Sequence, residues 1–185
     1  MNYKNLVDPE LRPIAQSIPY NRAVIACANF FLPIALRLTP VPKGLRRRVI
    51  TVNGHKGFAF RAELFEPSDA EGRLPALIDL HGGAFSYKAS PYHKRLACLY
   101  AAGARCRVFS PDYHLTPKYP YPAAYDDAAA LFRHMTEHAE AFGVDPERIC
   151  VAGDSAGGAL AALICSRYAS EGLERPRAQM LIYPL

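Results

Sequence analysis

Apolar residues follow two different spacings along the chain, and each spacing predicts a different kind of element. Residues 47–52 and 58–65 alternate between apolar and polar side chains, which is typical of strands. Asn53-Gly54 between them is a turn signal, so we expect an antiparallel pair. Short apolar runs that predict buried strands follow at residues 74–80, 107–113, 148–152 and 179–183.

Helices are predicted between these buried strands. Residues 92–102 carry apolar side chains at helical spacing and end at Gly103. A second helix ends at Gly143, and its predicted apolar face consists of Ala128, Leu131, Phe132, Met135, Ala139 and Phe142. Residues 159–165 predict a third helix. Strands that alternate with helices indicate a mostly parallel sheet with right-handed crossovers.

Residues 1–40 precede this alternating pattern and are apolar in part. We expect helical pieces there, divided by Pro9, Pro13, Pro19, Pro33 and Pro40. Residues 23–38 are the most apolar stretch, but they are shorter than the ~20 residues of a membrane span, and they include Asn29. We therefore predict a helix that packs on an apolar surface. It is either part of a lid over a site or a plain helix docked on the core.

Composition and charge narrow the classes of function. The chain has 185 residues, of which 50% are hydrophobic and 21% charged, as in globular domains. The net charge is +5, and Arg46-Arg47-Arg48 contributes much of it. Basic residues are otherwise scattered, so we expect a solvated basic face and no nucleic-acid partner. Five cysteines without a C-x-x-C pair favour reduced thiols in a cytoplasmic protein, and no spacing indicates a metal or a cofactor.

Ser155 stands where an apolar run meets a predicted helix, within Gly153-Asp-Ser-Ala-Gly-Gly158. A sharp strand-to-helix turn projects a serine hydroxyl towards a base and a substrate. Gly153 and Gly157 have no side chain to clash where the chain doubles back. The start of the helix places the amide of Ala156 beside any oxyanion formed there. We interpret Ser155 as a candidate nucleophile, and an ordinary glycine-rich turn is the alternative.

A second glycine-rich motif, His81-Gly82-Gly83-Ala84-Phe85, follows another buried strand. Glycines free the backbone to aim its amides into a cleft, so the amides of Gly82, Gly83 or Ala84 are candidate oxyanion donors. Each such donor typically contributes ~3 kcal/mol of transition-state stabilisation. We interpret His81 as structural, because a hydrogen-bonded histidine at a strand end is the common case. Both motifs lie at carboxyl ends of strands, where active sites of such sheets occur.

Together these motifs resemble the α/β-hydrolase fold and, more narrowly, the hormone-sensitive-lipase-like esterases of the acetyl esterase/lipase type. Residues 81–85 look like that family's oxyanion loop, residues 153–158 like its nucleophile elbow, and residues 112–124 like a further segment of it. Ala84 replaces the third glycine of the loop, and His114 and Lys118 replace an arginine and a glutamate.

The resemblance covers roughly residues 45–185 and implies a fold and its division. The expected fold is a three-layer α/β-hydrolase fold, with a mostly parallel sheet, helices on both faces and the C-terminal strands missing. Residues 1–44 then form an N-terminal helical lid segment, and residues 45–185 form the N-terminal portion of the catalytic domain.

The resemblance also implies a serine hydrolase that cleaves small, short-acyl carboxylic esters without a cofactor. In this fold the triad acid and histidine follow the serine. The sequence has no histidine after Ser155, and its only later acids are Glu171 and Glu174. We expect the N-terminal part of a longer enzyme, truncated after the sixth strand and nearly inactive alone. A non-catalytic binding protein and a fragment completed by a partner chain remain alternatives, and the oligomeric state is not predicted.

Overall fold

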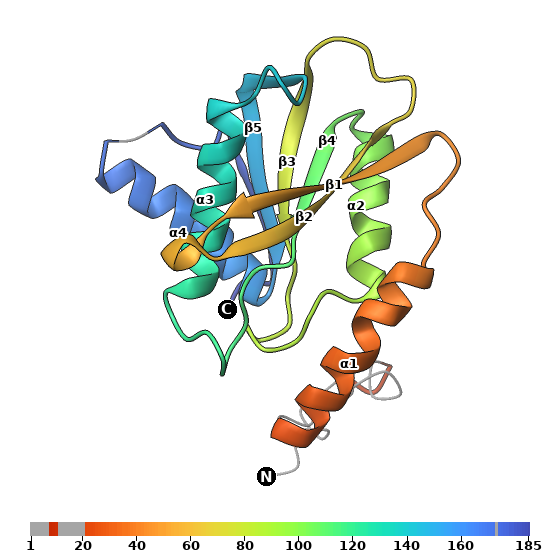
Figure 1. Cartoon of the computed structure of the whole chain (residues 1–185), viewed down its shortest axis with the longest axis vertical. Coiled ribbons are helices and arrows are strands. Elements are labelled where there is room, and N and C mark those ends of the chain that lie inside the picture. Colours follow the sequence, from red (N-terminus) through yellow and green to blue (C-terminus); the bar gives the residue numbers. More distant parts are fainter. Residues whose placement is uncertain (1–7, 11–20, 173) are drawn as a thin grey trace.

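The strands form one twisted sheet at the centre of the molecule (Figure 1). The computed structural model describes residues 8–10, 21–172 and 174–185. Within them the sheet order is β1-β2-β4-β3-β5-β6. The strands are β1 (Leu45–Asn53), β2 (Ala59–Pro67), β3 (Leu74–Leu80), β4 (Arg107–Pro111), β5 (Val144–Asp154) and β6 (Gln179–Ile182). β4, β3, β5 and β6 run parallel, and β1 and β2 form an antiparallel edge.

Helices cover both faces of this sheet. They are α1 (Arg22–Leu38), the short 3-10 helix η2 (His55–Gly57), α2 (Pro91–Gly103), α3 (Ala123–Glu137) and α4 (Ala156–Ser170). Figure 1 shows α3 and α4 on one face and α2 on the other, with α1 extending beyond one end of α2. The predicted three-layer α/β fold is therefore confirmed.

The two faces of the sheet bury separate cores. Leu64, Ile78 and Phe109 pack with side chains from α3 and α4, whereas Phe65 and Val108 pack with side chains from α2. Leu64 and Phe65 are neighbours on β2 and point to opposite faces, because successive side chains of a strand alternate. A sheet covered on both faces therefore needs apolar residues at consecutive positions, which explains the short apolar runs in the sequence.

From residue 45 onwards each predicted strand and helix has an observed counterpart, although several boundaries are displaced. The antiparallel pair is confirmed, since Val52 lies opposite Phe60 in the β1–β2 register. α3 ends at Glu137, so Ala139 and Phe142 lie in the turns that follow instead of on the predicted helix. Both still pack against the core, because these turns keep the two side chains on the inner side.

α1 differs from the expected helical pieces. The helix continues through Pro33, which lies exposed within it, although a proline removes one backbone hydrogen bond. The predicted apolar packing is correct only in part, because Ile25 is buried while four large apolar side chains of α1 are exposed: Phe30, Phe31, Ile34 and Leu38. No helix among the described residues is long and apolar enough to cross a membrane. The other predicted pieces fall largely in residues 1–7 and 11–20, outside the described residues.

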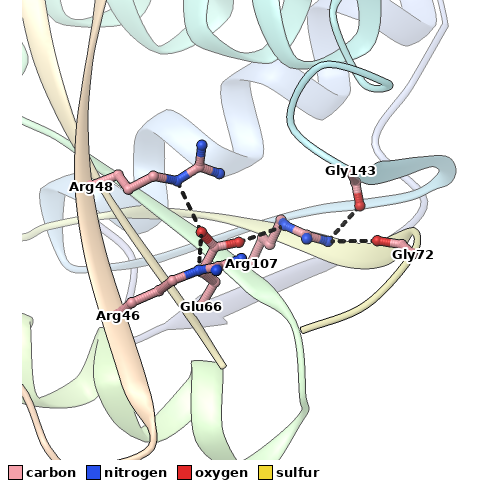
Figure 2. Close-up of polar contacts among 6 residues, drawn as sticks. All are labelled: Arg46, Arg48, Glu66, Gly72, Arg107 and Gly143. Atoms are coloured by element: carbon pink, nitrogen blue, oxygen red, sulfur yellow. Dashed lines mark hydrogen bonds and ion pairs between the residues drawn. The ribbon is translucent and has the colours of Figure 1, made fainter. Parts of the chain in front are cut away.

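One buried carboxylate forms salt bridges with three arginines near the amino-terminal ends of the parallel strands (Figure 2). Glu66 on β2 is fully buried and accepts from the Nε atoms of Arg46 and Arg48 at 2.9 Å and of Arg107 at 2.8 Å. Burial by itself raises the pKa of Glu66, but these hydrogen bonds and positive charges outweigh it and hold that pKa below its usual value. Arg46 and Arg48 belong to the predicted basic face, and both are partly exposed to solvent while they pair with the buried Glu66.

Arg107 extends this cluster to the neighbouring strands. Its Nη1 atom donates to the carbonyl oxygens of Gly72 and Gly143, which precede β3 and β5 (Figure 2). The cluster therefore fixes the ends at which these strands begin, and the motifs that carry the candidate chemistry follow their opposite ends.

Candidate active site

Ser155 lies on a strained turn between β5 and α4. Its φ of 49° and ψ of −117° lie outside the regions that residues with a side chain normally adopt, which costs on the order of 1–3 kcal/mol. A Cβ atom on Gly157 would lie 1.8 Å from the carbonyl oxygen of Leu80, and one on Gly153 would lie 2.3 Å from the Gly157 backbone. The turn therefore packs directly against the end of β3, and only glycine fits at these two positions, as predicted.

A backbone hydrogen bond also holds this turn against β6. The amide of Ser155 donates to the carbonyl oxygen of Ile182 on β6 at 2.9 Å. Ala156 begins α4, and its own amide donates to no acceptor among the described residues. The free amide at the start of a helix carries partial positive charge, so it is suited to bind an oxyanion beside Ser155.

The loop after β3 turns its backbone through three consecutive residues with positive φ. These values are 131° at Gly83, 50° at Ala84 and 55° at Phe85. The amides of Gly83 and Ala84 donate to no described acceptor, while the Gly83 carbonyl accepts from the amides of Ser86 and Tyr87. The loop is thus internally fixed and leaves two amides unused. Ala84 stands where the resembling family has glycine, and its left-handed conformation costs roughly 1–2 kcal/mol.

Gly82 behaves differently from the two residues that follow it. Its amide donates to Oδ1 of Asp154 at 2.8 Å, so it is not free to bind an oxyanion. This corrects the prediction that included Gly82 among the candidate donors. The reason is tertiary, because the carboxylate that occupies the amide comes from the end of β5. The remaining candidate donors are the amides of Gly83, Ala84 and Ala156.

His81 is buried and held as a neutral side chain. Its Nδ1 atom lies 2.7 Å from the Gly82 carbonyl oxygen, and because a carbonyl only accepts, Nδ1 carries the proton. The ring stacks on Tyr113 with centroids 4.4 Å apart, and the Tyr113 hydroxyl donates to the His81 carbonyl at 2.6 Å. Burial lowers the pKa of His81 to about 4. These contacts agree with a structural role.

His93 is a residue of the site that the sequence did not predict. Its Nδ1 atom accepts from the amide of Ser90 at 2.9 Å, and its Nε2 atom lies 3.5 Å from Oδ1 of Asp154. Burial alone would raise the pKa of Asp154, but its hydrogen bonds with His93 and with the Gly82 amide hold that pKa below its usual value. No local pattern indicates this pair, because its members are far apart in the sequence.

The segment after β4 contacts a buried carboxylate despite its departures from the resembling family. Asp127 on α3 is fully buried, and its Oδ2 atom accepts from the amide of His114 and lies 2.7 Å from His114 Nδ1. Its Oδ1 atom accepts from the amide of His55 at 2.8 Å. His114, which stands where the family has arginine, therefore contacts the buried carboxylate of Asp127. Lys118 lies over the ring of Tyr119, 4.9 Å from its centroid.

A cavity of about 320 Å³ lies between α1, α2 and the sheet. Its lining includes Asp79, His93, Lys88 and Asp112, but not Ser155. Burial and the charge of Asp154 raise the pKa of Asp79 to about 7, against an opposing effect of His93. In the described part of the chain, no three His, Cys, Asp or Glu side chains are grouped to hold a metal ion.

Comparisons with known proteins agree with this architecture. A family model described as alpha/beta hydrolase fold matches residues 77–185. Carboxylesterase NlhH of Mycobacterium tuberculosis is 39% identical over 121 residues, which cover 65% of this chain and 38% of that protein. Esterase LipI of the same species is 32% identical over 188 residues, which cover 98% of this chain and 58% of that protein.

A solved structure extends the likeness to three dimensions. The hyperthermophilic esterase from Pyrobaculum calidifontis superposes with a TM-score of 0.80 at 33% identity, covering 96% of this chain and 58% of that one. The chain therefore spans between about two fifths and three fifths of the length of these relatives. All three motifs that carry the resemblance, at residues 81–85, 112–124 and 153–158, fall within the region that the family model matches.

Proposed function

The chain belongs to the α/β-hydrolase fold family, and we propose that it carries the nucleophile and oxyanion hole of a serine hydrolase that cleaves small, short-acyl carboxylic esters. One observation carries the proposal. Ser155 occupies a strained turn at the carboxyl end of β5. Three amides at the carboxyl ends of β3 and β5 have no acceptor among the described residues, namely those of Gly83, Ala84 and Ala156. Relatives named as carboxylesterase and esterase support the substrate class.

The proposed chemistry proceeds through an acyl-enzyme. Oγ of Ser155 attacks the ester carbonyl carbon, and a base takes its proton. The negative oxygen of the tetrahedral intermediate accepts hydrogen bonds from the three amides, each worth about 10²–10³ in kcat when removed in comparable enzymes. Collapse of the intermediate expels the alcohol, which takes the proton from the base. Water then attacks the acyl-enzyme by the same route and releases the carboxylic acid.

The base and its carboxylate partner are proposed to come from a longer form of the protein. All six histidines precede Ser155 in the sequence, and Oγ of Ser155 makes no hydrogen bond to a histidine of the described residues. The relatives are longer than this chain, which supports an acid and a histidine beyond Leu185. We also propose that residues 1–44 act as a lid, since α1 borders the cavity beside the loop after β3.

Hydrolysis of p-nitrophenyl acetate tests the proposal, using the protein as its source makes it. Ser155→Ala should lower kcat by about 10⁶-fold, the loss measured when the nucleophile is removed from a comparable triad. Ser170→Ala is the matched control, because this exposed serine at the end of α4 only donates to the Arg167 carbonyl. The 185-residue chain alone should turn over near the background rate. Wild-type turnover in Ser155→Ala, or no turnover in the complete protein, would refute the proposal and favour a binding protein.

A further inference from the structure

We propose that Asp154 is a positioning residue that joins the oxyanion loop to the nucleophile turn through the amide of Gly82. The inference rests on the proposed function, since it concerns how that site is held in shape. Asp154 immediately precedes Ser155, and Gly82 immediately precedes the two loop amides that lack acceptors. One hydrogen bond of 2.8 Å therefore connects the residue before the nucleophile with the residue before the proposed donors.

The register of the sheet makes this hydrogen bond possible. β3 and β5 are adjacent parallel strands, and Leu80 lies opposite Gly153 at their carboxyl ends. Both strands end at nearly the same level, so Gly82, two residues past the end of β3, lies beside Asp154, the last residue of β5. The approach is closer than any side chain would allow, because a Cβ atom on Gly82 would lie 2.3 Å from Oδ2 of Asp154. Gly82 is thus required for the contact itself, and not as a free donor.

His93 holds the carboxylate in place from the other side. The Ser90 amide can only donate, so Nδ1 of His93 is its acceptor and the proton of the neutral ring lies on Nε2. That nitrogen faces Oδ1 of Asp154 at 3.5 Å, the same oxygen that the Gly82 amide binds. Ser90 is also the N-cap of α2. The start of α2, the nucleophile turn and the oxyanion loop are therefore linked through one carboxylate oxygen.

This link should affect the transition state more than substrate binding. The oxyanion develops only as Ser155 attacks, so donors that are displaced weaken the transition state and leave the ground state nearly unchanged. A displacement of about 1 Å costs on the order of 10²-fold in rate. Loss of the Asp154–Gly82 hydrogen bond should therefore lower kcat and leave KM nearly constant.

Substitutions at position 154 test the inference in the complete protein with p-nitrophenyl acetate. Asp154→Ala removes the acceptor, and we expect kcat to fall by about 30–100-fold with KM changed less than about threefold. Asp154→Asn keeps an Oδ1 atom that can accept from both Gly82 and His93, so kcat should stay within about fivefold of wild type. Asp145→Ala is the matched control, because Asp145 also accepts from a backbone amide of β5 but lies at its opposite end.

Hydrogen–deuterium exchange separates the structural link from catalysis. The Gly82 amide should exchange slowly in wild type and in Asp154→Asn, and at least about tenfold faster in Asp154→Ala, since its acceptor is gone. Wild-type kcat in a folded Asp154→Ala, or equally low kcat in the Asn and Ala variants, would overturn the inference. Fast exchange at Gly82 in wild type would overturn it as well. A failure of the proposed function is recognised separately, because Ser155→Ala would then leave turnover unchanged.

Discussion

Asp79 offers a test of how the packing around the site affects stability. It lies on β3 two residues before His81, in the lining of the cavity between α1, α2 and the sheet. Burial and the nearby Asp154 raise its pKa from 3.8 to about 7, although His93 acts in the opposite direction. Replacement of Asp79 by Asn keeps the shape of the side chain and removes the ionisable group.

The sign of the effect follows from where the proton is bound. Between pH 4 and pH 7 the folded protein holds a proton on Asp79 that the unfolded chain has lost, so stability falls as pH rises through this range and is constant above it. A shift from 3.8 to about 7, at 1.36 kcal/mol per pH unit, corresponds to about 4 kcal/mol at its upper limit. Asp79 retains partial exposure to the cavity, so water reduces this cost, and we expect about 2–4 kcal/mol.

Denaturant unfolding at pH 4, 6 and 8 measures this prediction. At each pH we compare the free energy of unfolding of Asp79→Asn with that of the wild type. The difference, variant minus wild type, should be about 2–4 kcal/mol larger at pH 8 than at pH 4. Comparison across pH cancels any constant effect of the amide on packing. Asp69→Asn is the control, since its exposed side chain should give no such change with pH. A stability difference between Asp79→Asn and wild type that is the same at all three pH values would refute the reasoning.

Two further predictions concern the backbone of the turn and the buried carboxylate. Gly157→Ala should destabilise the protein by more than about 3 kcal/mol, because the new Cβ would overlap the Leu80 carbonyl. Gly103→Ala is the control, since there is open space around this position, and it should change stability by less than about 1 kcal/mol. Equal thermal midpoints for the two variants would contradict this prediction. Glu66→Gln should cost about 3–5 kcal/mol in denaturant unfolding at pH 7, and Arg46→Ala, which removes a half-exposed partner, under about 1 kcal/mol. The contribution of Glu66 is present above its ordinary pKa of about 4.3 and is lost as pH falls through its lowered folded pKa. A Glu66→Gln cost that does not decrease at any acid pH at which the wild type remains folded would therefore argue against ion pairing.

The sequence by itself determined the elements and the candidate nucleophile. The alternation in residues 58–65 and the short apolar runs predicted strands that the sheet contains, because side-chain spacing reflects backbone geometry directly. The glycines around Ser155 could be interpreted locally as well, since a tight turn excludes a Cβ atom within a few residues of itself. The displaced end of α3 and the continuation of α1 through Pro33 show the limit of such patterns, which describe spacing better than boundaries.

Only the tertiary structure decided which groups around Ser155 are free. The sequence placed Gly82 among the donors, but β3 and β5 end side by side, and Asp154 occupies its amide. The raised pKa of Asp79 and the contact between His93 and Asp154 arise in the same way, from strands and a helix that are distant in the sequence. The physical reason is that a hydrogen bond or a charge effect depends on distance in space. That distance is set by the order and register of the strands, which local patterns do not contain.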